Sequence, residues 1–347
     1  MRVLQFGLGP IGLLTLGAVL DRPDVLEVVG AVDIDPEKVG RDVSEFLGLD
    51  RPTGITVSAD ASGALAASRP DVVLHTTSSF LETAAEQIAI CVEAGAHVVS
   101  STEELAYPFH RHPDLSERLD RLAREHGVVV VGTGVNPGFA MDALALIATG
   151  TCTGVRSVRV ERVVDAAGRR LPLQRKVGAG IEAAEFAERK ASGTFGHIGL
   201  VESLRLVAAG LGWTIDRVEE ELEPMLATRD VQTPFLTVPR GRVAGIHHSV
   251  KGFGPAGASG GSGPIISLDL KMYAGAEEPQ DAVYVDGDPP IDLVVRGGIF
   301  GDTATAGALV NAVGLVGRAP AGLRTVADLP LPRAFGTRPI TASVPAA

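Results

Sequence analysis

Cysteine, positive charge and long hydrophobic runs are all scarce in this chain. Its 347 residues include only two cysteines, Cys91 and Cys152. Two cysteines provide no disulfide framework and no zinc site, and their apolar or small neighbours predict buried thiols in a reducing compartment. No apolar run approaches the roughly 18 residues that a membrane helix needs. The N-terminus also lacks the pattern of a cleaved leader, so we expect a cytoplasmic protein that does not bind membranes.

The charge balance excludes another class of partner. Lys and Arg number 31 against 42 Asp and Glu, which gives a formal net charge of -11. The basic residues are scattered rather than clustered, so the chain is not expected to bind nucleic acid. His, Cys and Asp residues show no metal-ligand spacing, and we expect no metal. The length predicts two domains, because one hydrophobic core rarely serves so many residues.

A glycine-rich motif stands near the N-terminus, directly after an apolar run. The motif reads Gly7-Leu8-Gly9-Pro10-Ile11-Gly12. The first glycine permits a tight turn, the second leaves room for a pyrophosphate, and the third lets helix and strand pack closely. A second apolar run ends at Asp33, where a carboxylate binds the adenosine ribose in dinucleotide sites. The alternative is a glycine-rich turn without a ligand. We expect cofactor contacts from Gly7, Gly9, Pro10, Ile11, Gly12 and Asp33.

The order of apolar and helical segments predicts an α/β fold. Residues 1–142 alternate between them, as in a Rossmann-type doubly wound parallel sheet that binds a dinucleotide. Residues 143–300 predict an α+β domain for substrate binding and dimerisation. Residues 301–347 predict a helix and an irregular tail that pack back on the first domain. The expected strands are 3–6, 28–32, 71–74, 97–100, 128–131, 155–164, 264–273 and 291–296, and the expected helices of the second domain are 183–191 and 200–211.

Small hydroxyl residues follow the third expected strand. The segment after that strand reads His75-Thr76-Thr77-Ser78-Ser79. The carboxyl ends of parallel strands bind ligands in open α/β sheets, so Thr76, Thr77 and Ser78 are candidate cofactor contacts. These side chains could equally cap the helix that follows.

Five segments, taken in order, resemble a known family. They read STEELAYP at 101–108, GTGVNPGF at 132–139, RRLPLQ at 169–174, GHIGL at 196–200 and GDTATA at 301–306. The chain resembles the 2,4-diaminopentanoate dehydrogenases and the related native amine dehydrogenases, whose N-terminal domain is similar to dihydrodipicolinate reductase. The resemblance extends to about Pro330. It implies a nicotinamide-dependent homodimer that interconverts an amine and a ketone plus ammonia, with its active site between the domains.

Glu103 and Glu104 are the candidate catalytic residues. They follow the fourth expected strand, in a partly apolar neighbourhood that tends to raise the pKa of a carboxylate and suits proton transfer. One carboxylate could bind ammonium, deprotonate it and then hold a cationic iminium. Successive residues point in different directions, so we expect only one to face the substrate and prefer Glu103. The alternative is that the pair merely complements a helix dipole.

The loop at 132–138 and three further positions are expected to shape the pocket. Its glycines and Pro137 fix a tight backbone that could present Asn136 to the nicotinamide carboxamide, or could be a plain interdomain turn. The resemblance assigns the pocket wall to Val135, Phe139 and Ala140. His197 could contact substrate or satisfy a backbone carbonyl.

Two questions concern the ligands. Arg162, Arg169 or Arg170 could receive the carboxylate of a diamino acid, or could form surface ion pairs. Because the expected wall is apolar, we favour ammonia-dependent reductive amination of small aliphatic aldehydes and ketones.

For the cofactor, Asp33 should disfavour a 2′-phosphate, whereas Lys38 and Arg41 partly offset its charge. We therefore expect NADH to be preferred and NADPH to be accepted.

Three alternatives to that function remain. The first is a 2,4-diaminopentanoate dehydrogenase proper. The second is an imine reductase similar to dihydrodipicolinate reductase, because residues 247–251 read HHSVK, the start of that family's signature; the rest of the signature is missing. The third is a nucleotide-binding sensor without catalysis, which the intact glutamate pair disfavours.

Overall fold

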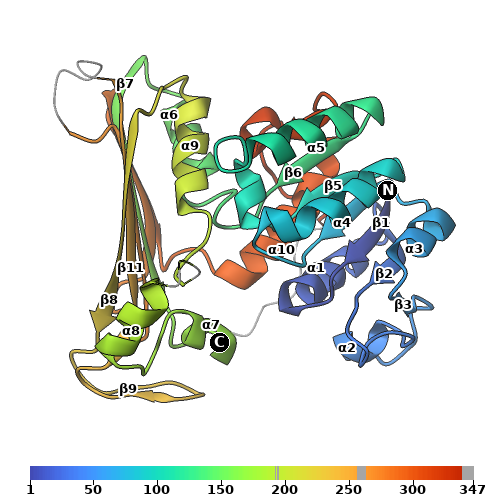
Figure 1. Ribbon diagram of the computed structural model, residues 1–347, viewed down its shortest axis with the longest axis horizontal. Helices are drawn as coiled ribbons and strands as arrows, with labels where there is room; N and C mark the ends of the chain where they lie inside the picture. Colours follow the sequence, from blue (N-terminus) through green and yellow to red (C-terminus); the bar gives the residue numbers. More distant parts are fainter. Residues whose placement is uncertain (192, 194, 256–262, 338–347) are drawn as a thin grey trace. The chain divides into compact units, whose positions relative to one another are not determined.

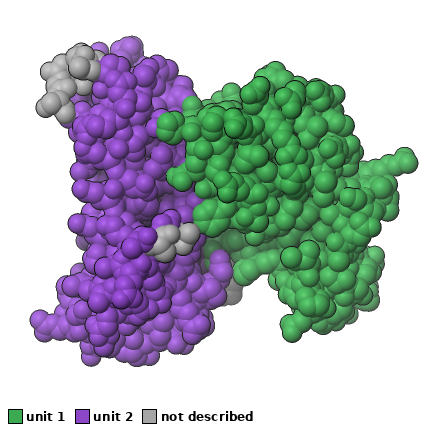
Figure 2. All heavy atoms as spheres, in the orientation of Figure 1, with its two compact units in different colours: residues 1–134, 302–347 green, residues 135–301 purple. Residues whose placement is uncertain are grey.

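The computed structural model describes residues 1–191, 193, 195–255 and 263–337 (Figure 1). The chain forms two compact units. One comprises residues 1–134 and 302–347, and the other comprises residues 135–301 (Figure 2). The division at residues 142 and 300 that the sequence suggests stays a prediction. Within the described residues, no helix is long and apolar enough to cross a membrane.

The first unit is built on a seven-stranded parallel sheet. The strand order is β15-β6-β5-β4-β1-β2-β3, and every neighbouring pair is parallel. The predicted doubly wound sheet is therefore confirmed. The strands are β1 (Arg2–Phe6), β2 (Glu27–Val32), β3 (Val57–Ser58), β4 (Val72–His75), β5 (His97–Ser100), β6 (Val129–Gly132) and β15 (Gly322–Arg324).

Helices cover both faces of this sheet, which explains why its central strands are apolar throughout. Leu4 and Val73 face a core shared with α3, α4 and α5. Val3 and Val72 face the opposite core, to which α1 and α10 contribute Val19 and Val310. The helices are α1 (Pro10–Leu20), α2 (Ser44–Leu47), α3 (Ala61–Ser68), α4 (Leu81–Glu93), the 3-10 helix η1 (Glu103–Ala106), α5 (Pro113–Glu125), α10 (Gly301–Val316) and the 3-10 helix η2 (Val326–Asp328).

The second unit contains a six-stranded mixed sheet in the order β14-β13-β7-β12-β11-β8. Among the described strands of this sheet, only β7 and β12 pair in parallel, and α6 and α9 lie along one face (Figure 1). The predicted α+β organisation is confirmed. Its elements are α6 (Ala143–Thr149), β7 (Gly154–Asp165), α7 (Leu171–Lys176), α8 (Ala183–Ala191), α9 (Leu200–Gly210), β8 (Arg217–Leu226), β9 (Val231–Gln232), β10 (Thr237–Val238), β11 (Val243–Phe253), β12 (Ile266–Tyr273), β13 (Gln280–Asp288) and β14 (Ile291–Arg296).

Two smaller expectations concern the cysteines and the C-terminal tail. Cys91 is buried, and desolvation raises the pKa of its thiol to about 12. Cys152 is only half-buried, contrary to the prediction, because it precedes β7 at the edge of the unit and its Sγ donates to the Pro289 carbonyl. Residues 330–337 form no helix or strand, and residues 338–347 of the expected irregular tail lie outside the described residues.

Candidate active site

The glycine-rich turn joins β1 to α1 at the carboxyl edge of the parallel sheet. Gly7 has φ +91°, a conformation that favours glycine. A Cβ on Gly12 would lie 2.0 Å from the Gly7 carbonyl oxygen, so packing alone requires this glycine. At Gly9, by contrast, no described atom lies within 4 Å of an added Cβ. The fold does not explain Gly9, whereas a bound group approaching the backbone there would.

The start of α1 is suited to an anion. Pro10 occupies the first helical turn, where its missing N–H costs nothing. Among the described residues no side chain caps this helix, so its first N–H groups, which carry the positive end of the helix dipole, are available to a pyrophosphate. The strand order also reverses between β1 and β4, the point where such sheets bind ligands. These residues fit a dinucleotide.

Asp33, after β2, contacts the same turn. Its Oδ2 accepts a hydrogen bond from the Leu8 N–H at 2.6 Å, and its Oδ1 accepts one from the Asp35 N–H. The Lys38 ammonium lies 3.5 Å from Asp33 Oδ2. Arg41 instead pairs with Glu45. Of the two downstream basic residues, only Lys38 therefore lies beside the candidate ribose ligand.

The three hydroxyl residues after β4 have local hydrogen bonds. Thr76 Oγ1 donates to the Gly7 carbonyl at 2.9 Å and accepts from the buried Gln5 amide, which links β4 to the glycine turn. Thr77 donates to Gln87, and Ser78 accepts from the Phe80 N–H. None of these bonds caps α4, whose first N–H is met by Glu104 instead.

His75, the last residue of β4, is completely buried beneath this edge. Its Nδ1 is 2.9 Å from Ser100 Oγ, and its Nε2 is 2.9 Å from Gln87 Oε1. Burial lowers the pKa of His75 to about 4, and the hydrogen bond with Gln87 only partly opposes this shift. The imidazole is therefore uncharged at neutral pH, and its role is structural, through its hydrogen bonds with Ser100 and Gln87.

This burial predicts acid sensitivity. In the unfolded chain His75 binds a proton as the pH falls below about 6.5, whereas in the folded protein it stays neutral down to about pH 4. The free energy of unfolding therefore decreases as the pH falls through that window. The His75 contribution to the loss between pH 7.5 and pH 4.5 should be about 2 to 3 kcal/mol. Urea unfolding at both pH values, in the wild type and in His75→Gln, measures it. Equal losses in the two proteins would contradict the assignment.

The two glutamates of η1 have different environments. Glu104 is 5% exposed, and its Oε2 accepts the Leu81 N–H and lies 2.8 Å from His112 Nε2. Glu104 thereby accepts the first N–H of α4, because the side chain of the N-cap residue Phe80 has no polar atom that could do so. Glu103 is only half-buried at the same edge. Nothing in the sequence pointed to His112 as the partner that separates the two roles.

The loop that opens the second unit is held by a buried carboxylate. Asp142 Oδ2 accepts hydrogen bonds from the Gly138 N–H at 2.8 Å and from Ser203 Oγ at 2.7 Å, and burial raises the pKa of Asp142. Sequence analysis missed this residue, although an Asp before an apolar helical run signals an N-cap. Val135 and Ala140 are buried, whereas Phe139 is half-buried.

Asn136 and His197 lie together in this unit. The Asn136 amide Nδ2 is 3.0 Å from His197 Nε2 and 3.3 Å from the sulfur of Met141. Desolvation lowers the pKa of His197 well below its usual value, and the positive charges of Lys176, His248 and Arg162 add to this shift. Within the part of the chain that the structure describes, the hydrogen-bond partner of His197 is therefore a side chain, that of Asn136.

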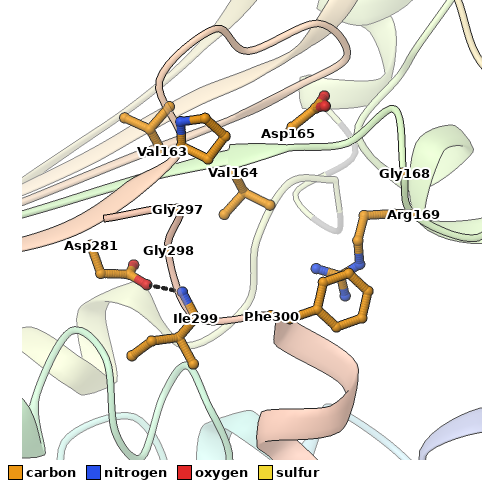
Figure 3. A pocket seen from close by; sticks show the side chains of 11 residues that line it. Val163, Val164, Asp165, Gly168, Arg169, Asp281, Gly297, Gly298, Ile299 and Phe300 are labelled. Carbon is orange, nitrogen blue, oxygen red and sulfur yellow. Dashed lines mark hydrogen bonds between the residues drawn. The ribbon is translucent and has the colours of Figure 1, made fainter. Parts of the chain in front are cut away.

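Arg162 is locked in a buried ion pair. Its guanidinium lies 2.9 Å from Asp281 Oδ1 and donates to the Ile299 carbonyl, and Asp281 accepts the Ile299 N–H. Asp281 and Ile299 also border a pocket of about 220 Å³, in which Arg169 lies 4.6 Å from the centre of the Phe300 ring (Figure 3). It is lined by Val163, Val164, Asp165, Gly168, Arg169, Pro279, Asp281, Gly297, Gly298, Ile299 and Phe300.

The two histidines of the HHSVK segment lie in β11. His247 pairs with Asp269 at 2.6 Å and His248 pairs with Glu220 at 2.8 Å. Each is thus engaged by a carboxylate of a neighbouring strand. An anionic substrate would have to displace these partners, so the geometry disfavours a dicarboxylate site here.

Comparison with known proteins assigns the family. The model of the 2,4-diaminopentanoate dehydrogenase C-terminal domain matches residues 139–340. The 2,4-diaminopentanoate dehydrogenase of Acetoanaerobium sticklandii is 32% identical over 343 residues, 96% of this chain and 95% of that protein. This chain belongs to the 2,4-diaminopentanoate dehydrogenase family. The predicted resemblance is confirmed, and the family consists of oxidoreductases that act on amines.

Two further relatives extend the match. An amine dehydrogenase of Streptomyces virginiae is 27% identical and covers 95% of this chain and 96% of its own length. The solved structure of the amine dehydrogenase from Mycobacterium smegmatis has a TM-score of 0.83 and 27% identity, and covers 97% of this chain and 98% of its own. The family assignment and the fold therefore agree over nearly the whole chain.

Proposed function

We propose that this family member is a nicotinamide-dependent amine dehydrogenase that converts small aliphatic aldehydes or ketones and ammonia into amines, and the reverse. The observation that carries the proposal is the shared edge of the parallel sheet. An unexplained glycine at position 9 follows β1, and a half-buried Glu103 follows β5, two strands away. The glycine turn proposed for the dinucleotide and the glutamate proposed for proton transfer thus follow strands at the same edge of the sheet. As the family resemblance implies, the enzyme is proposed to act as a homodimer, and its cysteine usage favours the cytoplasm.

The cofactor is assigned to the glycine turn. Gly7, Gly9 and Gly12, with the N-terminus of α1, would hold the pyrophosphate, and Asp33 would accept the ribose hydroxyls. Pro10 and Ile11 would contribute the first helical turn, and Thr76, Thr77 and Ser78 would line the adjoining strand end. When bound, the nicotinamide supplies or accepts the hydride of the reaction.

Glu103 is the proposed acid/base. Its carboxylate would bind ammonium and take a proton so that neutral ammonia can attack the carbonyl. It would return that proton as the carbinolamine hydroxyl leaves as water, and then balance the charge of the iminium until hydride arrives. Glu104 is assigned a structural role, because its Oε2 is engaged by Leu81 and His112. This division agrees with the preference for Glu103 drawn from the sequence.

The substrate class follows from the arginines and the wall. Arg162 donates hydrogen bonds to Asp281 and to the Ile299 carbonyl. It is therefore poorly placed to bind a substrate carboxylate in a bidentate way. Val135, Phe139 and Ala140 are apolar or small and would accept several carbonyls, since such walls discriminate only by about 1 to 3 kcal/mol per methylene. These features favour unfunctionalised substrates over 2,4-diaminopentanoate.

The substrate range tests this assignment. With ammonium and reduced cofactor, a series of straight-chain aldehydes and ketones should give measurable kcat/KM values that change gradually with chain length. Activity confined to 2,4-diaminopentanoate or another carboxylate-bearing amine would overturn the substrate class and point to an arginine clamp.

Cofactor preference is a separate expected result. NADH should be used with the higher kcat/KM because Asp33 repels a 2′-phosphate, and NADPH should be accepted because Lys38 partly neutralises that carboxylate. Lys38→Ala should lower kcat/KM for NADPH and leave the value for NADH near the wild type. Arg41→Ala is the matched control, because Arg41 pairs with Glu45 and should not alter the ratio. A wild type that strongly prefers NADPH would refute the role of Asp33.

A further inference from the structure

The Asn136 carboxamide has one satisfied end and one unsatisfied end. Its Nδ2 donates to His197 Nε2 at 3.0 Å and to the sulfur of Met141 at 3.3 Å. Its Oδ1 is buried, yet has no hydrogen-bond partner within the part of the chain that the structure describes. Buried polar atoms are rarely left unpaired, because burial removes the water that would otherwise bind them. A partner for this oxygen is therefore expected.

Two neighbours fix which end of the carboxamide faces the protein. The sulfur of Met141 can accept a hydrogen bond but cannot donate one. The His197 ring can accept at Nε2 when its proton is on Nδ1. Loss of solvent, with a smaller contribution from nearby positive groups, lowers the pKa of His197 and keeps the ring uncharged. Two acceptors thus select the amino end of Asn136, and the carbonyl end points away from both.

The backbone that carries Asn136 is also fixed. Asp142 holds the Gly138 N–H with one carboxylate oxygen, and the same oxygen accepts from Ser203 on α9. Asp142 Oδ1 accepts from Ala143 at the start of α6. The loop is therefore attached to both α6 and α9. An acceptor held by both its side chain and its backbone has little freedom to lose when a ligand binds, which is the requirement for a preorganised contact.

We propose that Asn136 Oδ1 is a preorganised acceptor for an N–H group of the bound ligand, and that His197 is a positioning residue that fixes its polarity. The inference rests on the proposed function, which provides two such groups: the carboxamide of the nicotinamide and the amino group of the substrate. Both are uncharged or cationic nitrogen donors. In this proposal His197 acts through Asn136 and not by contact with the substrate, which was one of the two roles that the sequence left open.

The first arm of the test compares two oxidised cofactors by calorimetry. In 3-acetylpyridine adenine dinucleotide a methyl ketone replaces the carboxamide, so the shape is kept and the N–H is lost. If the carboxamide is the donor, the wild type should bind NAD about tenfold or more tightly than this analogue. Asn136→Leu and His197→Leu should lose the difference, and Asn136→Ala replaces Asn136→Leu if the latter does not fold.

A conservative variant separates positioning from general structural damage. The side-chain oxygen of the variant His197→Gln can accept the same N–H from Asn136, so this protein should regain the discrimination that His197→Leu loses. A role of His197 in packing alone would lower the affinities for NAD and for the analogue together and leave their ratio unchanged. That result would overturn the positioning role.

The second arm measures amine binding to the enzyme with NAD bound, again by calorimetry. If the substrate is the donor, the wild type will not distinguish the two cofactors, but Asn136→Leu will weaken the affinity for a small amine by about tenfold, and His197→Gln will keep it. If the variants change neither the ratio of the two cofactor affinities nor the affinity for the amine, the proposal is overturned, and the partner of Oδ1 is a buried water. Both arms report binding, so an absence of turnover would refute the proposed function without deciding this inference.

Discussion

Replacing Glu103 by glutamine should lower kcat by about 10²- to 10⁴-fold and leave the affinity for the nicotinamide cofactor near the wild-type value. The amide keeps the shape of the side chain but cannot take a proton from ammonium or balance an iminium charge. Cofactor affinity should persist because the glycine turn and Asp33, rather than Glu103, are assigned to the dinucleotide. Steady-state kinetics and cofactor titration by fluorescence measure the two quantities separately.

Glu104→Gln is the matched control for that substitution. It changes the neighbouring carboxylate in the same way, but at a residue that accepts from Leu81 and lies against His112. We expect a loss of about 1 to 3 kcal/mol in the free energy of unfolding and a kcat much closer to the wild type. If Glu104→Gln abolishes turnover and Glu103→Gln does not, the two roles are reversed. Near-wild-type rates in both proteins would refute the acid/base assignment altogether.

Gly9→Ala should produce a folded protein that has lost most of its cofactor affinity. No described atom lies near the added methyl group, and Gly9 has φ -65° and ψ -178°, which alanine adopts readily. Such a change leaves the fold intact or stabilises it by about 0.4 to 1 kcal/mol, because it restricts the unfolded chain. The methyl group would nevertheless occupy the space assigned to the pyrophosphate, so we expect the Kd for NADH to rise by tenfold or more.

Gly12→Ala provides the contrast. Its methyl group would meet the Gly7 carbonyl oxygen at 2.0 Å and Thr76 Oγ1 at 2.7 Å, so this variant should lose stability as well as cofactor affinity. Urea unfolding and NADH titration of both variants distinguish the two cases. Normal cofactor affinity in Gly9→Ala would show that the pyrophosphate does not lie at this turn.

The fold could be predicted where a physical pattern is strong. Buried parallel strands such as β5 are short apolar runs with turn residues at both ends, and the structure gives β5 the expected range, His97–Ser100. The strands β3 and β15 have only two and three residues, too few to show a period. Strand β11 contains His247 and His248, which resemble the start of a signature motif although each is a sheet residue that contacts a carboxylate of a neighbouring strand.

The sequence could predict what kind of site the chain contains, but not the hydrogen-bond and ion-pair partners of its residues. Glycine spacing and an acidic residue at the right distance could indicate a dinucleotide turn, because backbone geometry restricts which residues can stand there. The partners of Glu104, Arg162 and Asn136 come from segments distant in the sequence, and no local rule brings His112, Asp281 or His197 to them. Asp142 is an intermediate case, because its capping position is local whereas its bond to Ser203 is not.

The measurement that tests the central claim most directly is the stoichiometry of reductive amination. Purified enzyme is mixed with a small aliphatic aldehyde or ketone and NADH, with and without ammonium, and both the loss of NADH and the formation of amine are followed. The account predicts one amine formed for each NADH consumed, with consumption that requires ammonium and is lost in Glu103→Gln. NADH oxidation that proceeds equally without ammonium and yields an alcohol, or no oxidation with any carbonyl tested, would contradict it.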